Sequence, residues 1–183
     1  LERDLPIVVL WPPPADSLRE FWEHPLTSAD NGAALVLELG RGPARALLAA
    51  DADSAVERAI AVEPGLALLK VAHHGSGSSS GARFLGRVRP LYAAISVGRF
   101  NRFGHPDRGA LARLEATGAR VVRTDREGAL WFDLSDAGIS RIDWRAGTIA
   151  VAPAAGPASR MPAHHGFVSR NRSAIDPVHL PQR

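Results

Sequence analysis

The sequence predicts a layered α/β domain, because apolar segments of strand length alternate with segments of helical periodicity. Apolar runs at 66–71 and 91–97 predict buried strands. A helix is expected over 107–117, where Leu111 and Leu114 share one face. Several of the expected strands end in polar residues at loops, which is where layered α/β folds usually place their sites.

Composition is that of one globular domain with some excess chain. The 183 residues are 45% hydrophobic and 22% charged. Cysteine is absent, which excludes disulfides, thiolate metal sites and a cysteine nucleophile. No apolar run approaches the roughly 18–20 residues that span a bilayer, so a soluble polypeptide is expected. We expect a domain over 1–152 and, because 153–183 lacks periodicity, a disordered tail.

The remaining elements follow from apolar runs, turn residues and caps. Further strands are expected at 7–10, 33–39, 44–49, 121–122 and 129–134. Further helices are expected at 15–24, 54–62 and 80–88. A final hairpin would pair 142–144 with 148–151.

The chain is moderately basic, with a net charge of +3, and almost all of its positive charge is arginine, since Lys70 is the single lysine. Nine arginines lie in one segment: Arg87, Arg89, Arg99, Arg102, Arg108, Arg113, Arg120, Arg123 and Arg126. Guanidinium groups suit phosphate oxygens, so an anionic polymer is a reasonable partner. The alternative is a solvated surface in an arginine-biased composition, which explains most of these arginines without a partner, and both interpretations stay open.

The segment 69–80 carries the strongest chemical signal. His73 and His74 end a predicted strand, and Gly75 allows the backbone to turn. Neutral imidazole is a common metal ligand and a near-neutral acid or base. The alternative is a strand-end pair in which one ring caps the strand and the other faces water. Four serines follow without a base partner at a recognisable spacing, so we expect a flexible, hydrogen-bonding loop: Ser76, Ser78, Ser79 and Ser80.

Asp51 follows the apolar run 46–50. A carboxylate at the end of a buried strand can bridge two metal ions. It can equally cap the helix expected to begin near Ser54, a role for which Asp53 competes.

His105 precedes Pro106 in the loop that follows the strand 91–97. It could contact a phosphate or act as an acid, or it could be a surface histidine. We expect Asp125 to make turn hydrogen bonds. The second pair, His164 and His165, has no strand before it and is assigned no chemistry.

Seven short segments follow one another along the chain. They are VLWPP at 9–13, DNG at 30–32 with LVL at 35–37, LLAAD at 47–51, LKVAHHGS at 69–76, ISVG at 95–98, NRFGHP at 101–106 and RTDREG at 123–128. In this order they resemble the C-terminal metallo-β-lactamase-like domain of the ComEC family of DNA-uptake competence proteins. The resemblance covers about residues 7–133.

The resemblance implies an αββα sandwich with a two-metal hydrolase site that binds Zn or Mn. Asp51 would bridge the metals, His74 would be a ligand, His73 would lie beside the phosphate and His105 would line the pocket. The implied substrate is DNA, single-stranded or duplex, and the implied role is degradation of the strand that does not enter the cell. The parent protein would lie in the bacterial inner membrane, with a channel region as partner.

The sequence also departs from the family pattern. The His-x-Asp-x-Asp-His run expected before Trp11 is missing, and so is the membrane-spanning channel region. Ala49 and Ala50 replace the usual Thr-Gly, and GHPDR at 104–108 replaces Gly-His-Pro-His-Pro. We therefore expect the C-terminal part of such a domain, as a fragment or truncated gene product. The alternatives are a non-catalytic remnant, a DNA-binding module that uses arginines, or another phosphoesterase of the same superfamily.

Overall fold

A six-stranded sheet organises the computed structural model, which describes residues 5–13 and 33–145. The order in the sheet is the order in the chain: β1 (Ile7–Trp11), β2 (Val36–Leu39), β3 (Ala46–Leu48), β4 (Leu68–Lys70), β5 (Tyr92–Ile95) and β6 (Arg120–Arg123). The first three strands pair antiparallel, and β3 to β6 pair parallel. The predicted α/β class is confirmed.

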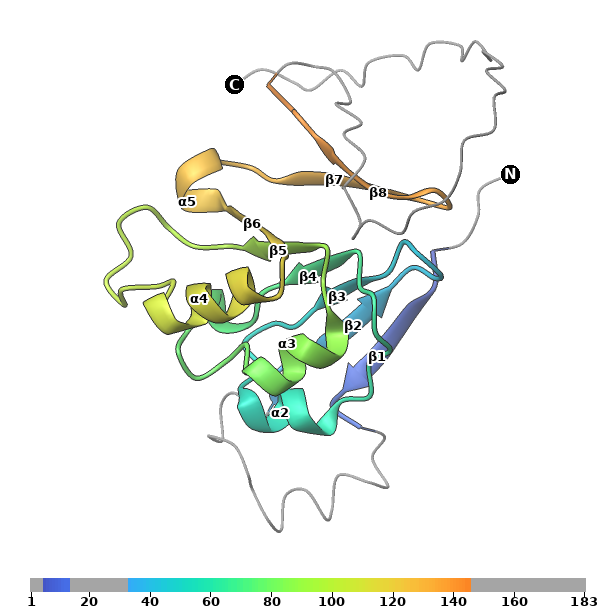
Figure 1. Cartoon of the computed structure of the whole chain (residues 1–183), viewed down its shortest axis with the longest axis horizontal. Helices are drawn as coiled ribbons and strands as arrows, with labels where there is room; N and C mark the ends of the chain where they lie inside the picture. Colours follow the sequence, from blue (N-terminus) through green and yellow to red (C-terminus); the bar gives the residue numbers. More distant parts are fainter. Residues whose placement is uncertain (1–4, 14–32, 146–183) are drawn as a thin grey trace.

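Helices connect the parallel strands and cover one face of the sheet (Figure 1). They are α2 (Ser54–Ala59), α3 (Ala82–Val88) and α4 (Arg108–Ala116). The main core lies between these helices and the sheet, and its fully buried side chains include Leu47, Leu69, Ile95, Val56 and Leu85. Burial of these apolar groups holds the helix layer on the sheet.

A β-hairpin covers the opposite face of the sheet (Figure 1). It consists of β7 (Trp131–Ser135) and β8 (Gly138–Ile142), and the one-turn helix α5 (Thr124–Glu127) leads into it from β6. Tyr92 and Phe132 meet edge to face there, with ring centroids 5.3 Å apart. The described residues thus form three layers, namely helices, sheet and hairpin.

Several predictions fall outside the described residues. These are the helix at 15–24, the tail at 153–183, the pair His164 and His165, and the strand at 148–151. The expected final hairpin is therefore only partly comparable with the structure, in which β8 pairs with β7 instead. Among the described residues, no helix combines the length and apolar character needed to cross a membrane.

Strand β1 lies at one end of the strand order. Ile7, Val8 and Val9 are each more than half exposed, although their side chains alternate between the two faces of the sheet. This strand is the most weakly covered part of the described sheet.

Candidate active site at the strand ends

The parallel direction of β3, β4 and β5 brings the chain segments that follow them to one edge of the sheet. Asp51 follows β3, and the 3-10 turn η2 (Ala72–Gly75) carries both histidines directly after β4. The segment after β5 adds Ser96 and, later, the loop that carries His105.

His74 faces Asp51 across this edge. The His74 Nε2 atom lies 3.7 Å from Asp51 Oδ1, and both side chains are about half exposed. The His74 Nδ1 atom lies 2.7 Å from the carbonyl oxygen of Ser96. A carbonyl only accepts, so this bond places a proton on Nδ1 and leaves a lone pair on Nε2 of the neutral ring. Two lone-pair atoms then face each other, an arrangement that a cation or a shared proton would stabilise.

His73 lies beside this pair. Its backbone N–H donates to the carbonyl of Ala50 at 3.0 Å, which ties the histidine turn to the segment before Asp51. Its Nδ1 atom is buried and has no hydrogen-bond partner among the described residues. Both histidines have positive φ angles, 47° for His73 and 53° for His74.

His105 is brought against His73, with ring centroids 5.8 Å apart in an edge-to-face arrangement. Asn101 fixes the backbone of His105 twice. The Asn101 Nδ2 group donates to the His105 carbonyl at 2.7 Å, and the His105 N–H donates to Asn101 Oδ1 at 2.9 Å. The structure thus brings all four predicted site residues to one edge.

The histidine turn and the His105 loop also contact each other through their backbones. The Asp107 N–H donates to the carbonyl of Gly75 at 2.8 Å. Gly75 has a φ of +82°, and a Cβ atom on it would lie 2.6 Å from Pro106 Cβ. Glycine is required here both for the left-handed backbone and for the close approach.

The capping alternative for Asp51 is resolved by its neighbour. Asp53 is the N-cap of α2, since its carboxylate accepts from the N–H groups of Ala55 at 2.8 Å and Val56 at 3.2 Å. Asp51 is therefore not needed for the helix and remains directed to the site edge.

Two residues that sequence reasoning missed hold the serine loop that follows the histidines. Glu57 is buried in α2, and its carboxylate accepts from the N–H groups of Ser80 and Gly81. Burial raises the pKa of Glu57, and these backbone donors offset part of that rise. From the other side, Arg113 of α4 donates to the carbonyls of Ser80 at 2.8 Å and Ser79 at 2.9 Å. The one sequence signal for this contact was Glu57 itself, an acidic residue among the apolar residues of the helix expected over 54–62.

Within that loop, the predicted hydrogen-bonding role of the serines is seen at Ser79. Its hydroxyl is buried and donates to the carbonyl of Ala72 at 3.0 Å.

Lys70 was also missed as a site neighbour. Its Nζ group donates to the carbonyl of Ala50 at 3.2 Å, next to Asp51. Burial lowers the pKa of Lys70, and the charge of Asp51 acts in the opposite direction. The single lysine of the chain therefore supports the segment that carries Asp51.

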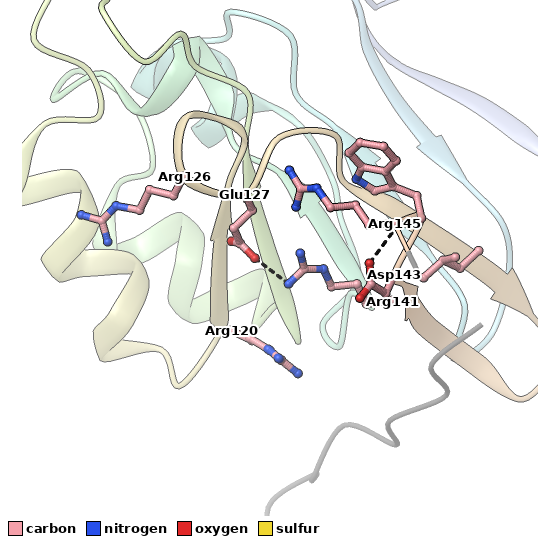
Figure 2. Close-up of a pocket in the computed structure, with 8 residues that line it drawn as sticks. Arg120, Arg126, Glu127, Arg141, Asp143 and Arg145 are labelled. Atoms are coloured by element: carbon pink, nitrogen blue, oxygen red, sulfur yellow. Dashed lines mark hydrogen bonds and ion pairs between the residues drawn. The ribbon is translucent and has the colours of Figure 1, made fainter. Parts of the chain in front are cut away.

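An arginine-lined pocket lies apart from the four site residues, between α5, β6 and the end of the hairpin. Figure 2 shows its lining, and its volume is about 390 Å³. Arg141 pairs with Glu127 at 2.7 Å, and the Arg145 N–H donates to Asp143 Oδ1 at 3.0 Å. The lining residues are Arg120, Arg126, Glu127, Arg141, Ile142, Asp143, Trp144 and Arg145. Four arginines against two carboxylates make this pocket suited to an anion.

Asp125 plays a structural role, close to the one predicted. Its carboxylate pairs with Arg123 in two hydrogen bonds of 2.9 and 2.6 Å, and the Arg123 guanidinium holds the pKa of Asp125 below its usual value.

Asp51 and His74 fit part of a metal site. An imidazole nitrogen whose partner nitrogen donates to a carbonyl is the usual form of a histidine ligand, and the carboxylate oxygen beside it is a second ligand type. Within residues 5–13 and 33–145, no group of three or more histidine, aspartate or glutamate side chains gathers around a common point.

Comparison with known proteins adds a family relationship. No protein-family model matches the chain. The chain is 38% identical over 114 residues to competence protein ComA of Neisseria gonorrhoeae, and 34% identical over 134 residues to ComE operon protein 3 of Bacillus subtilis. The chain is similar to a segment of each of these two proteins. A third relative, recombination protein 2 of Haemophilus influenzae, is 35% identical over 100 residues.

The matches to these three relatives cover 60%, 72% and 54% of this chain but 16%, 16% and 13% of the relatives. The chain therefore corresponds to one segment of much longer proteins. These relatives support the predicted kinship with the ComEC family.

Proposed function

We propose that this chain is part of a ComEC-type DNA-uptake protein and contributes to a metal-dependent phosphodiesterase site in a metallo-β-lactamase-like domain. The competence homologues support the DNA-uptake role, and the α/β layers are compatible with such a domain. In this proposal the whole protein lies in the bacterial inner membrane, with a channel region as partner and DNA as substrate.

The single observation that carries the catalytic proposal is the approach of His74 Nε2 to Asp51 Oδ1, at 3.7 Å. Both side chains follow the ends of central strands and are about half exposed. Asp51 and His74 would hold a divalent metal such as Zn or Mn. Tight binding takes three or four ligands, so the proposal requires further ligands beyond this pair. A bound divalent metal supplies a Lewis acid and a water of lowered pKa for attack on a phosphodiester.

The neighbouring residues would position the substrate and the ligands. The Ser96 carbonyl orients the His74 ring through the Nδ1 hydrogen bond. The His73 and His105 rings pack edge to face, and in this proposal their N–H groups donate to phosphate oxygens of the substrate. Asn101 holds His105 for that role.

A metal-binding measurement tests this proposal directly. Mn²⁺ binding by the full chain, followed by calorimetry, should be detectable in the wild type and at least about 10-fold weaker in His74→Ala. His105→Ala is the matched control, because it removes a neighbouring imidazole that is not a proposed ligand. The absence of Mn²⁺ and Zn²⁺ binding by the wild-type chain would contradict the metal site.

A second candidate function is DNA binding without cleavage, which the arginine-lined pocket favours. Hydrolysis of a labelled oligonucleotide separates the two. Mn²⁺-dependent cleavage that His74→Ala abolishes supports the phosphodiesterase, whereas DNA binding without cleavage under the same conditions supports the binding module.

A further inference from the structure

The loop at 98–105 exposes two large aromatic rings next to the candidate site. Phe100 is 93% exposed and Phe103 is 69% exposed. Aromatic side chains usually contribute large buried areas, so two exposed rings in one short loop indicate a surface that binds something. The loop connects β5 to α4 and carries His105.

Phe103 is held in place rather than projecting freely. Its ring stacks on His105, with centroids 6.0 Å apart and planes 19° apart, and the Arg102 guanidinium lies 5.2 Å from the Phe103 ring centroid. Two hydrogen bonds between Asn101 and the His105 backbone close the loop on either side of Phe103 in the chain.

These contacts form a continuous series of planar groups that leads into the site. It runs from Arg102 through Phe103 and His105 to His73, whose ring lies 5.8 Å from that of His105. A ligand stacked on Phe103 would therefore be directed toward the edge where Asp51 and His74 lie.

The charge of the loop selects the kind of ligand. The eight residues GRFNRFGH contain Arg99 and Arg102 and no acidic residue. Exposed aromatic rings interleaved with arginines match single-stranded nucleic acid, in which each base offers a face for stacking and each phosphate accepts from a guanidinium. A duplex fits less well, because its base faces are already stacked on each other.

We propose that the loop at 98–105 is a base-stacking platform for single-stranded nucleic acid. Phe100, which is 93% exposed, stacks on one base. A second base stacks on Phe103 in place of the Arg102 guanidinium, which turns to the adjoining phosphate, while the His105 ring stays stacked on Phe103. Arg99 contacts the next phosphate, and the strand is led past His105 toward His73. The direction of the strand rests on the proposed phosphodiesterase function, whereas the stacking itself does not require a metal or cleavage.

Fluorescence anisotropy with a labelled oligothymidylate, in the presence of EDTA, measures the platform separately from any metal-dependent step. Phe100→Ala and Phe103→Ala should each weaken binding about 5- to 150-fold, the range that loss of one stacked base gives. Phe103→Trp should bind at least as tightly as the wild type. Phe103→Leu keeps an apolar side chain but removes the ring, and it should bind as weakly as Phe103→Ala.

Two controls make the test specific. Trp131→Ala removes a 55% exposed ring on β7, outside the loop, and should leave binding unchanged. An oligonucleotide of equal length with abasic residues keeps the phosphates and removes the bases, so wild type and Phe103→Ala should bind it equally weakly. Urea unfolding of each variant identifies any loss that comes from misfolding, and Phe103→Trp remains informative if Phe103→Ala does not fold.

Wild-type affinity in the phenylalanine variants, or an equal loss for a duplex of the same sequence, would overturn the platform. So would the absence of single-strand binding by the wild type. Failure of the metal site is a separate result: ring-dependent binding without Mn²⁺ binding would overturn the phosphodiesterase and support the platform.

Discussion

Asp51 and Asp53 are two residues apart, but the structure gives them different roles. The Asp53 carboxylate accepts two N–H groups at the start of α2, and the Asp51 carboxylate faces His74. Side chains that satisfy helix N–H groups contribute to stability, whereas a half-exposed carboxylate at a site edge contributes little.

Substitution at these two positions should therefore separate stability from binding. Asp53→Ala should lower the free energy of unfolding by about 1 kcal/mol, and Asp53→Asn should restore most of that loss because asparagine is also a good N-cap. Asp51→Ala should change the free energy of unfolding by less than about 0.5 kcal/mol while weakening Mn²⁺ binding. Urea denaturation and calorimetry measure the two effects. Equal destabilisation by both alanine variants would contradict the assignment of the cap.

At the scale of elements, α2 both packs on the core and binds the serine loop that follows the histidine turn. Through Glu57 it binds the backbone immediately before α3, and through the same loop it adjoins the histidine turn. Helix α2 thus stabilises the loop that adjoins the histidine turn, without contributing a side chain to the site.

The pH dependence of stability should report this connection. Burial raises the pKa of Glu57 above 4.5, so the folded chain binds more protons at this group than the unfolded chain between the two pKa values. The stability that Glu57 contributes is full below the unfolded pKa and declines as the pH rises through the folded pKa.

Urea denaturation from pH 4 upward, compared between wild type and Glu57→Gln, measures this decline. The variant should be less stable at low pH by about 1–3 kcal/mol, because one buried N–H loses its acceptor, and the difference should shrink as the pH rises. Glu63→Gln, at an exposed position, should show no such trend. A difference that grows with pH would contradict the direction of the Glu57 shift.

At the scale of the whole molecule, coverage of the sheet is uneven. Helices and hairpin bury β3 to β6 on both faces, whereas β1 leaves Ile7, Val8 and Val9 largely exposed at the end of the strand order. An exposed apolar end strand is a template for pairing with another chain.

The isolated chain should therefore self-associate as its concentration rises. Val8→Lys should reduce this association without loss of folding, since residue 8 pairs with Glu38 across β1 and β2 and a lysine there faces an acidic neighbour. Analytical ultracentrifugation over a concentration series measures the effect. A wild-type chain that stays monomeric throughout would contradict this prediction.

Apolar periodicity predicted the elements better than it predicted the contacts of the site. Strand β5 lies inside the predicted 91–97 and α4 inside the predicted 107–117. β8 was missed except for its last residue, since the expected strand began at residue 142, because Gly-Ile-Ser-Arg-Ile is too mixed to show alternation. The Glu57 contact joins residues 23 and 24 positions apart, which no local pattern reveals. The four site residues were candidates from their places at strand ends and in a loop, the family resemblance implied their roles, and their distances required the structure.

The left-handed backbone of the histidine turn bears on the reason that histidines occupy it. Left-handed φ angles cost a non-glycine residue roughly 1–2 kcal/mol, and His73 and His74 both have them, directly before a glycine that adopts the same region freely. Glycine at either position would relieve that strain, and typical domains are stable by only about 5–15 kcal/mol. A turn that merely reversed the chain would have little reason to keep two imidazoles in strained conformations. The strain therefore favours a turn maintained for its side chains over one maintained for its shape.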